Sequence, residues 1–228
     1  MESLDNALKD LNLDIAEFKG EDFKNMELNR WLYFAKANKS FHEPGISYDE
    51  LKALHKACEF ALRSNNEAPL IMVETGMCFG TTTRYFVIRA LKYGGEVHSY
   101  ETQVREPFKK AMEELGLWKY VNVHGHSIRD PWIGKPINLL LIDSEHALED
   151  ALGEYMKFRV WLTAEAVVGF HDTDICPGVK RAIEIIQEVD ELELVSESSN
   201  KASAGIQFYR RVKVSRADMP WIRRKNAR

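Results

Sequence analysis

Two short stretches place acidic and imidazole side chains directly after apolar runs. In LLLIDSEH, Asp143 follows four apolar residues and His146 comes three positions later. In VVGFHDTD, His171 and Asp172 follow a second apolar run. A charge at the end of a buried strand is unfavourable unless it is paired or bound. The two stretches therefore predict one shared site where two buried strands end.

A divalent cation would relieve the repulsion between these aspartates if they converge. Oxygen-rich ligands favour Mg²⁺, Mn²⁺ or Ca²⁺. We expect Asp143 and Asp172 as metal ligands together with the neighbouring His171, and Asp174 is a further carboxylate that could converge on the ion. Each aspartate could instead cap the helix that follows it. A further alternative combines both histidines and one carboxylate in the facial triad of non-haem iron oxygenases, although a β-barrel is the usual scaffold for that triad.

His146 is the candidate general base, because the unperturbed pKa of histidine lies near ~6.5. We expect it in the first turn of the helix that follows the strand. The helix dipole would disfavour a positive charge there, and a spacing of three would place His146 on the same face as Asp143.

Strands alternate with helices from residue 69 onward. Apolar runs predict strands at 70–74, 96–101, 121–125, 137–143, 166–172, 192–197 and 205–211. Helical patterns occupy 81–93, 105–116, 147–162 and 178–189. This alternation predicts an α/β fold with a doubly wound and mainly parallel seven-stranded sheet. Ligands bind beyond the carboxyl ends of such strands, a rule that selects Glu74, Glu101, Ser127, Asp143 and Asp172.

The regions on either side of this pattern differ in character. Residues 1–66 have helical periodicity, including a capping box at Ser47 and Glu50, and predict a helical N-terminal cap on the domain at 67–211. The basic C-terminal tail, 212–228, is interpreted as a solvated extension or as a contact for an anionic partner or another subunit.

The loop VETGMCFGTTT joins the first predicted strand to a helix. Gly76 and Gly80 permit a tight turn and a close ligand approach, but the spacing matches neither the NAD fingerprint nor a phosphate-binding loop. Glu74 would suit a cationic ligand, whereas it would repel a pyrophosphate. Glu101 could accept hydrogen bonds from both ribose hydroxyls of an adenosine, and Ser127 could contact the adenine.

These motifs resemble the class I S-adenosylmethionine-dependent methyltransferases over about residues 69–211. The stretch from Glu74 through Gly80 and Thr81 is similar to the family's first motif, and SYE to its ribose-binding motif. LLIDSEHALEDALGEY and GVKRAIEII are similar to the metal-dependent branch that includes catechol and antibiotic-sugar O-methyltransferases. The resemblance implies a Rossmann-like methyltransferase fold with an antiparallel last strand at 205–211. It also implies Asp143 as a metal ligand that borders the cofactor and His146 as the base. The branch has a second pair of site residues, either an acidic residue followed by Asp or Asp followed by Asn. The corresponding positions in this sequence are His171–Asp172 or Asp172–Thr173.

We therefore predict S-adenosylmethionine-dependent, metal-assisted O-methylation of a small-molecule hydroxyl, as in a sugar, a natural product or a catechol. The alternatives are another nucleotide-binding Rossmann-like enzyme, or a non-catalytic module that binds S-adenosylmethionine or nucleic acid. The sequence has three cysteines without a paired spacing, and it shows neither a signal-peptide core nor a long apolar run. We therefore expect a cytoplasmic protein without a membrane partner. A nucleic-acid partner is not expected, whereas a homo-oligomer is left open.

Overall fold

The computed structural model of the chain describes residues 46–199 and 204–212. Seven strands form its sheet: β1 (Leu70–Thr75), β2 (Gly95–Tyr100), β3 (Val121–His124), β4 (Ile137–Ile142), β5 (Leu162–His171), β6 (Leu192–Ser198) and β7 (Ile206–Arg211). The helices are α3 (Tyr48–Ser64), α4 (Thr81–Tyr93), α5 (Glu106–Glu114), α6 (Leu148–Arg159) and α7 (Pro177–Val189), with a short 3-10 turn, η3 (Trp118–Tyr120).

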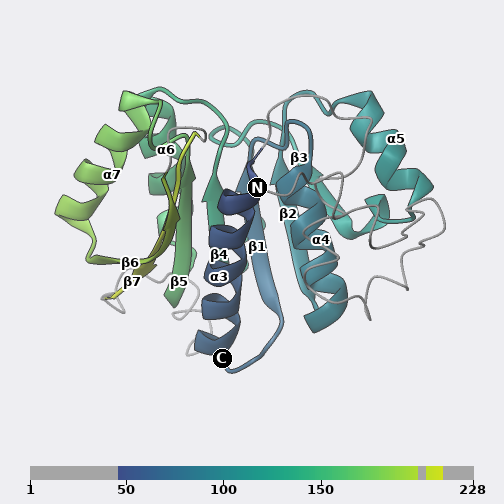
Figure 1. Cartoon of the computed structure of the whole chain (residues 1–228), viewed down its shortest axis with the longest axis horizontal. Helices are drawn as coiled ribbons and strands as arrows, with labels where there is room; N and C mark the ends of the chain where they lie inside the picture. Colours follow the sequence, from purple (N-terminus) through teal and green to yellow (C-terminus); the bar gives the residue numbers. More distant parts are fainter. Residues whose placement is uncertain (1–45, 200–203, 213–228) are drawn as a thin grey trace, which may run out of the picture.

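The strands lie in the order β3-β2-β1-β4-β5-β7-β6 (Figure 1). The four pairs from β3 to β5 are parallel, and β7 runs antiparallel to both β5 and β6. The first strand of the sheet, β1, lies near its centre. Strands β2 and β3 lie on one side of β1, and the chain then crosses back to place β4 and the later strands on the other side. The prediction of a doubly wound sheet with an antiparallel last strand is confirmed.

Helices cover both faces of this sheet, which explains why five of the six residues of β4 are apolar; the exception, Asn138, accepts the Ile71 amide through Oδ1. Leu139 and Leu141 pack in one core with residues of α3, α4 and α5. Leu140 and Ile142 pack in the other with residues of α6 and α7. All six residues of β4 are buried, as expected for a strand whose alternate side chains enter two cores.

Helix α3 belongs to the sheet domain and is not part of a separate cap. Its N-terminus has the predicted capping box, in which the Ser47 hydroxyl accepts from the Glu50 amide at 3.2 Å and the Glu50 carboxylate accepts from the Ser47 amide at 2.5 Å. Leu51, Leu54 and Leu62 lie in the same core as Leu139. We therefore place the described part of the predicted 1–66 cap in the α/β domain. The rest of that segment, 1–45, and nearly all of the 212–228 tail lie outside the described residues.

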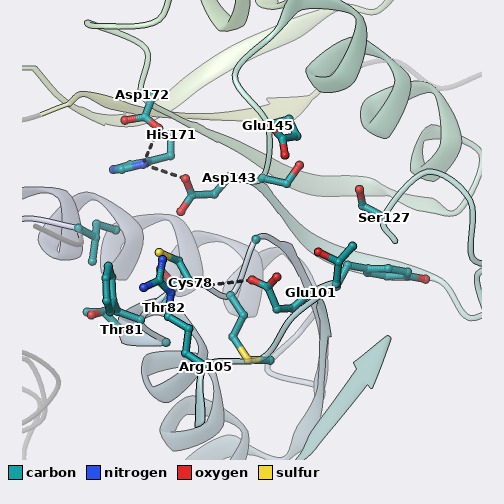
Figure 2. Close-up of a pocket in the computed structure, with 18 of the residues that line it drawn as sticks. Cys78, Thr81, Thr82, Glu101, Arg105, Ser127, Asp143, Glu145, His171 and Asp172 are labelled. Atoms are coloured by element: carbon teal, nitrogen blue, oxygen red, sulfur yellow. Dashed lines mark hydrogen bonds and ion pairs between the residues drawn. The ribbon is translucent and has the colours of Figure 1, made fainter. Parts of the chain in front are cut away.

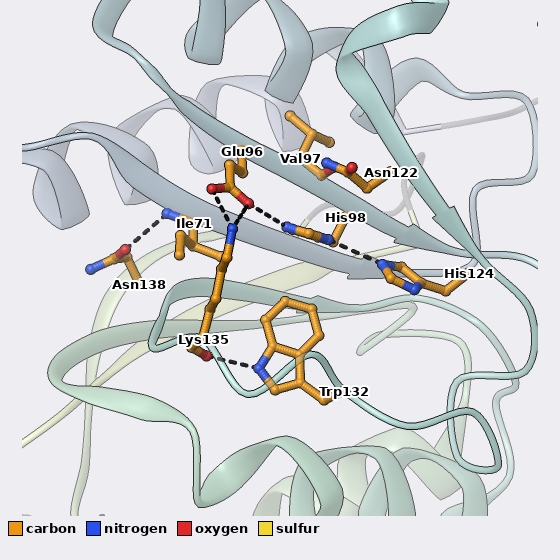
Figure 3. A network of polar contacts seen from close by, with 9 residues as sticks. All are labelled: Ile71, Glu96, Val97, His98, Asn122, His124, Trp132, Lys135 and Asn138. Atoms are coloured by element: carbon orange, nitrogen blue, oxygen red, sulfur yellow. Dashed lines mark hydrogen bonds and ion pairs between the residues drawn. The ribbon is translucent and has the colours of Figure 1, made fainter. Parts of the chain in front are cut away.

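A polar network fixes the β2–β3 edge, from which the loop carrying Ser127 departs (Figure 3). His98 Nδ1 lies 3.0 Å from His124 Nε2, and His98 Nε2 lies 3.1 Å from Glu96. Lys135 binds the same Glu96 carboxylate at 2.6 Å, and its carbonyl accepts the Trp132 indole N–H at 2.7 Å. Burial lowers the pKa of both histidines, so the network is built from neutral imidazoles.

Strand ends deliver the predicted site residues to one edge of the sheet. Glu101, Asp143 and Asp172 are the first residues after β2, β4 and β5. The main difference from the predicted pattern is that β5 starts at Leu162, inside the predicted 147–162 helix, because α6 ends at Arg159 and the chain turns through Trp161. Among the described helices, none has the length and apolar character required to span a membrane.

Candidate active site

A pocket of about 1200 Å³ lies beyond the carboxyl ends of the central strands. A volume of this size is enough for a nucleoside-containing cofactor together with a small acceptor. Nine of the ten predicted site residues line it: Gly76, Gly80, Thr81, Glu101, Ser127, Asp143, His146, His171 and Asp172. Figure 2 shows Glu101 and Cys78 on one side of Asp143, with His171 and Asp172 on the other.

The two glycines of the loop after β1 allow other parts of the protein to pack against the loop backbone. Gly76 has a φ of +81°, and a Cβ added there would lie 2.0 Å from the carbonyl oxygen of Asp143. Gly80 has a φ of +71°, and its added Cβ would lie 2.0 Å from the Phe108 ring. The predicted tight turn at Gly76 and Gly80 is therefore present. The groups that approach these glycines closely are the β4–α6 loop and helix α5, however, where the sequence had predicted a ligand. Thr81 follows as the first residue of α4.

Glu101 is fixed at the start of the loop after β2. Its two oxygens accept the amide N–H groups of Cys78 at 3.1 Å and Gln103 at 3.0 Å. Cys78 adopts a φ of +45°, an uncommon value outside glycine. Each carboxylate oxygen can accept further hydrogen bonds, so Glu101 remains able to bind a pair of hydroxyls. Ser127 follows β3 and is 7% exposed.

Glu74 is the predicted site residue that does not line the pocket, so the expected direct contact with a cationic ligand is wrong. Its side chain is fully buried inside the domain, where Oε1 accepts the hydroxyls of Thr83 and Ser99, each at 2.5 Å. The physical reason is the pleat of β1, which turns residue 74 toward α4 and not toward the open end of the sheet. Burial raises the pKa of Glu74 to about 7, although the two hydroxyls oppose that change. The carboxylate therefore connects β1, β2 and α4 under the glycine loop.

Replacing Glu74 with glutamine should flatten the pH dependence of stability. The carboxyl keeps its proton to about pH 7 when folded but loses it near pH 4.5 when unfolded. The free energy of unfolding should therefore fall by about 3 kcal/mol as the pH rises through this window, because ionised Glu74 is unfavourable in the folded state. Urea titrations at pH 5 and pH 8 measure the fall. Glu74→Gln should make it smaller by most of this amount, while the part due to His171, whose pKa is also raised in the folded state, remains.

The control for this experiment is Glu188→Gln, which removes an exposed carboxylate from α7. It should reproduce the pH dependence of the unmodified protein. An equal fall in the Glu74→Gln variant would show that another group is responsible.

The acidic end of the pocket is organised around His171, the last residue of β5. Its Nδ1 lies 2.9 Å from Asp143 Oδ1 and 3.5 Å from Asp172 Oδ2, while Nε2 lies 3.5 Å from Glu50 Oε1. Burial alone lowers the pKa of His171, but the three carboxylates outweigh it and raise the pKa to about 12. Burial raises the pKa of Asp143, whereas the interaction with His171 lowers that of Asp172. Without another cation, the imidazolium neutralises part of this acidic cluster.

His146 lies outside the helix that was predicted to carry it. Helix α6 begins at Leu148, and His146 stands two residues earlier in the β4–α6 loop. Its Nε2 is 2.5 Å from Asp172 Oδ2, so it is paired across the pocket with the end of β5 and not placed on one helical face with Asp143. Gly178 holds the loop close, since a Cβ there would lie 2.5 Å from the His146 carbonyl oxygen. The side chain is 47% exposed and open to the pocket.

Two sets of described side chains have donor atoms close enough together to hold a metal ion. One combines Asp143, His171 and Asp172, the predicted ligands, and the other combines His146, Asp172 and Cys176. All members of the first set line the pocket, whereas Cys176 does not. Neither set contains both histidines, so the described residues do not form the facial triad considered from the sequence.

Sequence reasoning missed two buried carboxylates that hold the site together. Glu50 was assigned only to the helix cap, yet it also accepts the Gly205 amide at 2.8 Å and faces His171. Glu154 on α6 accepts the hydroxyls of Thr75 at 2.7 Å and of Ser144, which connects the end of β1 to the loop after β4. The available signal for Glu154 was its position on the apolar face of a predicted helix, where an acidic residue needs a partner.

Comparison with known proteins gives a family match and many structural neighbours. Residues 73–173 match the family model described as a methyltransferase domain. No curated protein sequence gives a match. The matched segment contains the glycine loop, Glu101, Ser127, Asp143, His146, His171 and Asp172, which supply most of the pocket lining.

Three solved structures illustrate the similarity of fold. Cofactor-bound Rv0187 from MTB is 16% identical, with a TM-score of 0.60 over 81% of this chain and 91% of that chain. The Bacillus cereus O-methyltransferase in complex with SAH is 14% identical, with a TM-score of 0.58 over 82% and 93%. The O-methyltransferase TomG from Streptomyces achromogenes in complex with SAM is 16% identical, with a TM-score of 0.55 over 82% and 100%.

Proposed function

We propose, on the premise that residues 73–173 form a class I methyltransferase domain, that this chain transfers the methyl group of S-adenosylmethionine to a hydroxyl oxygen of a small molecule. The observation that carries the proposal is the pocket itself. It joins a fixed carboxylate suited to a ribose, Glu101, to a cluster suited to deprotonate and orient a hydroxyl, at Asp143, His146 and Asp172.

The cofactor would lie across the glycine loop. Glu101 accepts the ribose hydroxyls, Ser127 borders the adenine, and the loop from Gly76 to Thr81 supports the methionine portion. Asp143 separates this half of the pocket from the histidine half (Figure 2). An acceptor in the histidine half would therefore face the transferable methyl group.

His146 is the group placed to remove the acceptor's proton. Its Nε2 faces Asp172, so Nδ1 is the nitrogen that accepts the proton, and Asp172 stabilises the resulting imidazolium. The acceptor oxygen attacks the methyl carbon, the carbon–sulfur bond breaks, and its electron pair passes to sulfur to give S-adenosylhomocysteine. The main contribution of the remaining side chains is to position the two reactants.

Asp143, His171 and Asp172 would hold a divalent metal ion. Their donor atoms lie within 4.8 Å of one another, and the 2.9 Å between Asp143 Oδ1 and His171 Nδ1 is close to the separation of about 3 Å expected for adjacent ligands of an octahedral ion. The ion would take the place of the proton on Nδ1. When bound, it would lower the pKa of the acceptor hydroxyl as a Lewis acid.

Calorimetric titration with S-adenosylmethionine tests the cofactor assignment. Glu101→Ala should weaken binding roughly 10- to 100-fold, because up to two hydrogen bonds to a charged acceptor are lost. The N–H groups of Cys78 and Gln103 lose their acceptor as well, which would loosen the glycine loop.

The matched control is Glu106→Ala, which removes an exposed carboxylate from the same rim of the pocket. This variant should bind the cofactor as the unmodified protein does. Undiminished affinity in Glu101→Ala would refute the ribose site, and equal losses in both variants would indicate a general effect of charge.

A further inference from the structure

The two nitrogens of His171 face different surroundings. Nδ1 faces the pocket cluster, 2.9 Å from Asp143, whereas Nε2 is buried and directed toward Glu50 at 3.5 Å. A histidine that binds a metal usually does so through one ring nitrogen while the other faces a carboxylate or carbonyl that fixes the ring. His171 has this arrangement with respect to the cluster on one side and Glu50 on the other.

Glu50 is held rigidly enough to orient the imidazole. It is 1% exposed, and its carboxylate accepts amide N–H groups from Ser47 at 2.5 Å and Gly205 at 2.8 Å. These contacts join the start of α3, the approach to β7 and the end of β5. The Glu50 carboxylate is thus fixed by backbone donors at the N-cap of α3 and just before β7, on the side of His171 that faces away from the pocket cluster.

We propose that His171 supplies an imidazole nitrogen to the metal site, that Glu50 positions this ring, and that the site therefore prefers a later first-row transition metal such as Co²⁺ or Zn²⁺ over Mg²⁺ and Ca²⁺. This inference rests on the proposed metal site and specifies which ion it takes. Carboxylate and water ligands suit Mg²⁺ and Ca²⁺, whereas an imidazole nitrogen adds affinity for the transition metals. One imidazole with the carboxylates of Asp143 and Asp172 gives a mixed set with no net charge once a divalent ion is bound.

Paramagnetic resonance of the full chain loaded with Mn²⁺ tests the nitrogen ligand directly. The bound ion should show a ¹⁴N coupling from the imidazole. The coupling should be lost in His171→Asp, which replaces the nitrogen by a carboxylate and keeps an oxygen ligand at that position. Because the signal comes from the ion's own ligands, this result does not depend on activity.

Competition against bound Mn²⁺ tests the preference. In the unmodified protein, Co²⁺ should displace Mn²⁺ at a concentration at least about tenfold lower than Mg²⁺ does. In His171→Asp the ratio of Mg²⁺ to Co²⁺ needed for displacement should fall, because the nitrogen is gone.

Glu50→Gln tests the positioning role. It should weaken Mn²⁺ binding roughly 10- to 100-fold, the usual effect of losing an outer partner of a metal-binding histidine. The matched control is Ser47→Ala, which removes the other half of the same capping box and leaves the Glu50–His171 pair in place. Ser47→Ala should lower the melting temperature without weakening Mn²⁺ binding.

The outcomes separate this inference from the function on which it rests. Binding of Mn²⁺ without a ¹⁴N coupling, or with Mg²⁺ displacing it as readily as Co²⁺, would overturn the inference and leave a metal-assisted enzyme. Equal weakening by Glu50→Gln and Ser47→Ala would overturn the role of Glu50. Failure of every ion to bind, with S-adenosylmethionine still bound, would overturn both the inference and the proposed metal site.

Discussion

Replacing His146 with alanine should reduce the turnover number by roughly 10²–10⁴-fold, the usual contribution of a general base. The imidazole is half exposed at the pocket wall and paired with Asp172 through Nε2, so its removal eliminates the proton acceptor without disturbing the core. Formation of S-adenosylhomocysteine measures the rate, with an acceptor found among catechols and glycosides. Affinity for S-adenosylmethionine, measured by calorimetry, should stay within a few-fold of the unmodified value.

The comparison variant is His126→Ala. His126 lines the same pocket, but it follows β3 at the cofactor end, and its Nδ1 accepts the Ile128 amide at 3.1 Å. We expect a much smaller loss of turnover from this change. Normal turnover in His146→Ala would remove the base from the mechanism. Loss of metal binding in that variant would instead make His146 a ligand, in the set with Asp172 and Cys176.

Replacing Gly76 with alanine should lower the free energy of unfolding by about 3 kcal/mol or more. A φ of +81° disfavours any residue with a Cβ, and this Cβ would lie 2.0 Å from the Asp143 carbonyl oxygen. That oxygen belongs to the backbone, so the end of β4 would have to move and would carry Asp143 with it. Urea denaturation measures the loss of stability, and calorimetry should show loss of cofactor binding at temperatures where the variant is still folded.

Gly134→Ala separates the two causes. Gly134 has nearly the same φ, +80°, but its added Cβ would lie no closer than 3.5 Å to the Trp161 ring. This control should lose only the conformational part, about 1–2 kcal/mol. Equal losses in the two variants would show that the close approach of Asp143 to the glycine loop contributes nothing to stability.

The sequence alone determined the fold class and the approximate strand positions, and both are confirmed; residues 73–173 also match a methyltransferase domain, the family that the motifs resemble. These features depend on local and periodic information. Alternating apolar runs and helical stripes predict the sheet, and a parallel sheet puts Glu101, Asp143 and Asp172 at one edge, whatever the details of packing. The positions of the glycine loop and of Glu101 could be predicted for the same reason, since each directly follows a strand.

The tertiary structure decided which of these side chains touch. Glu74 was predicted beside the ligand, but the pleat of β1 directs it inward to Thr83 and Ser99. His146 was predicted on a helical turn beside Asp143, but its loop reaches Asp172 instead. A local sequence pattern fixes the position of a residue along an element, whereas a contact between two strand ends depends on the twist of the sheet and the path of a loop.

Glu50 is the clearest example of what the sequence could not determine. As the third residue of a capping box it was already explained by its own helix, and nothing in the sequence connected it to a histidine at the end of β5. Only the packing of α3 against the sheet brings the two together, because the contact joins segments that are distant along the chain. The same packing makes α3 part of the domain and brings to the pocket a carboxylate that faces His171.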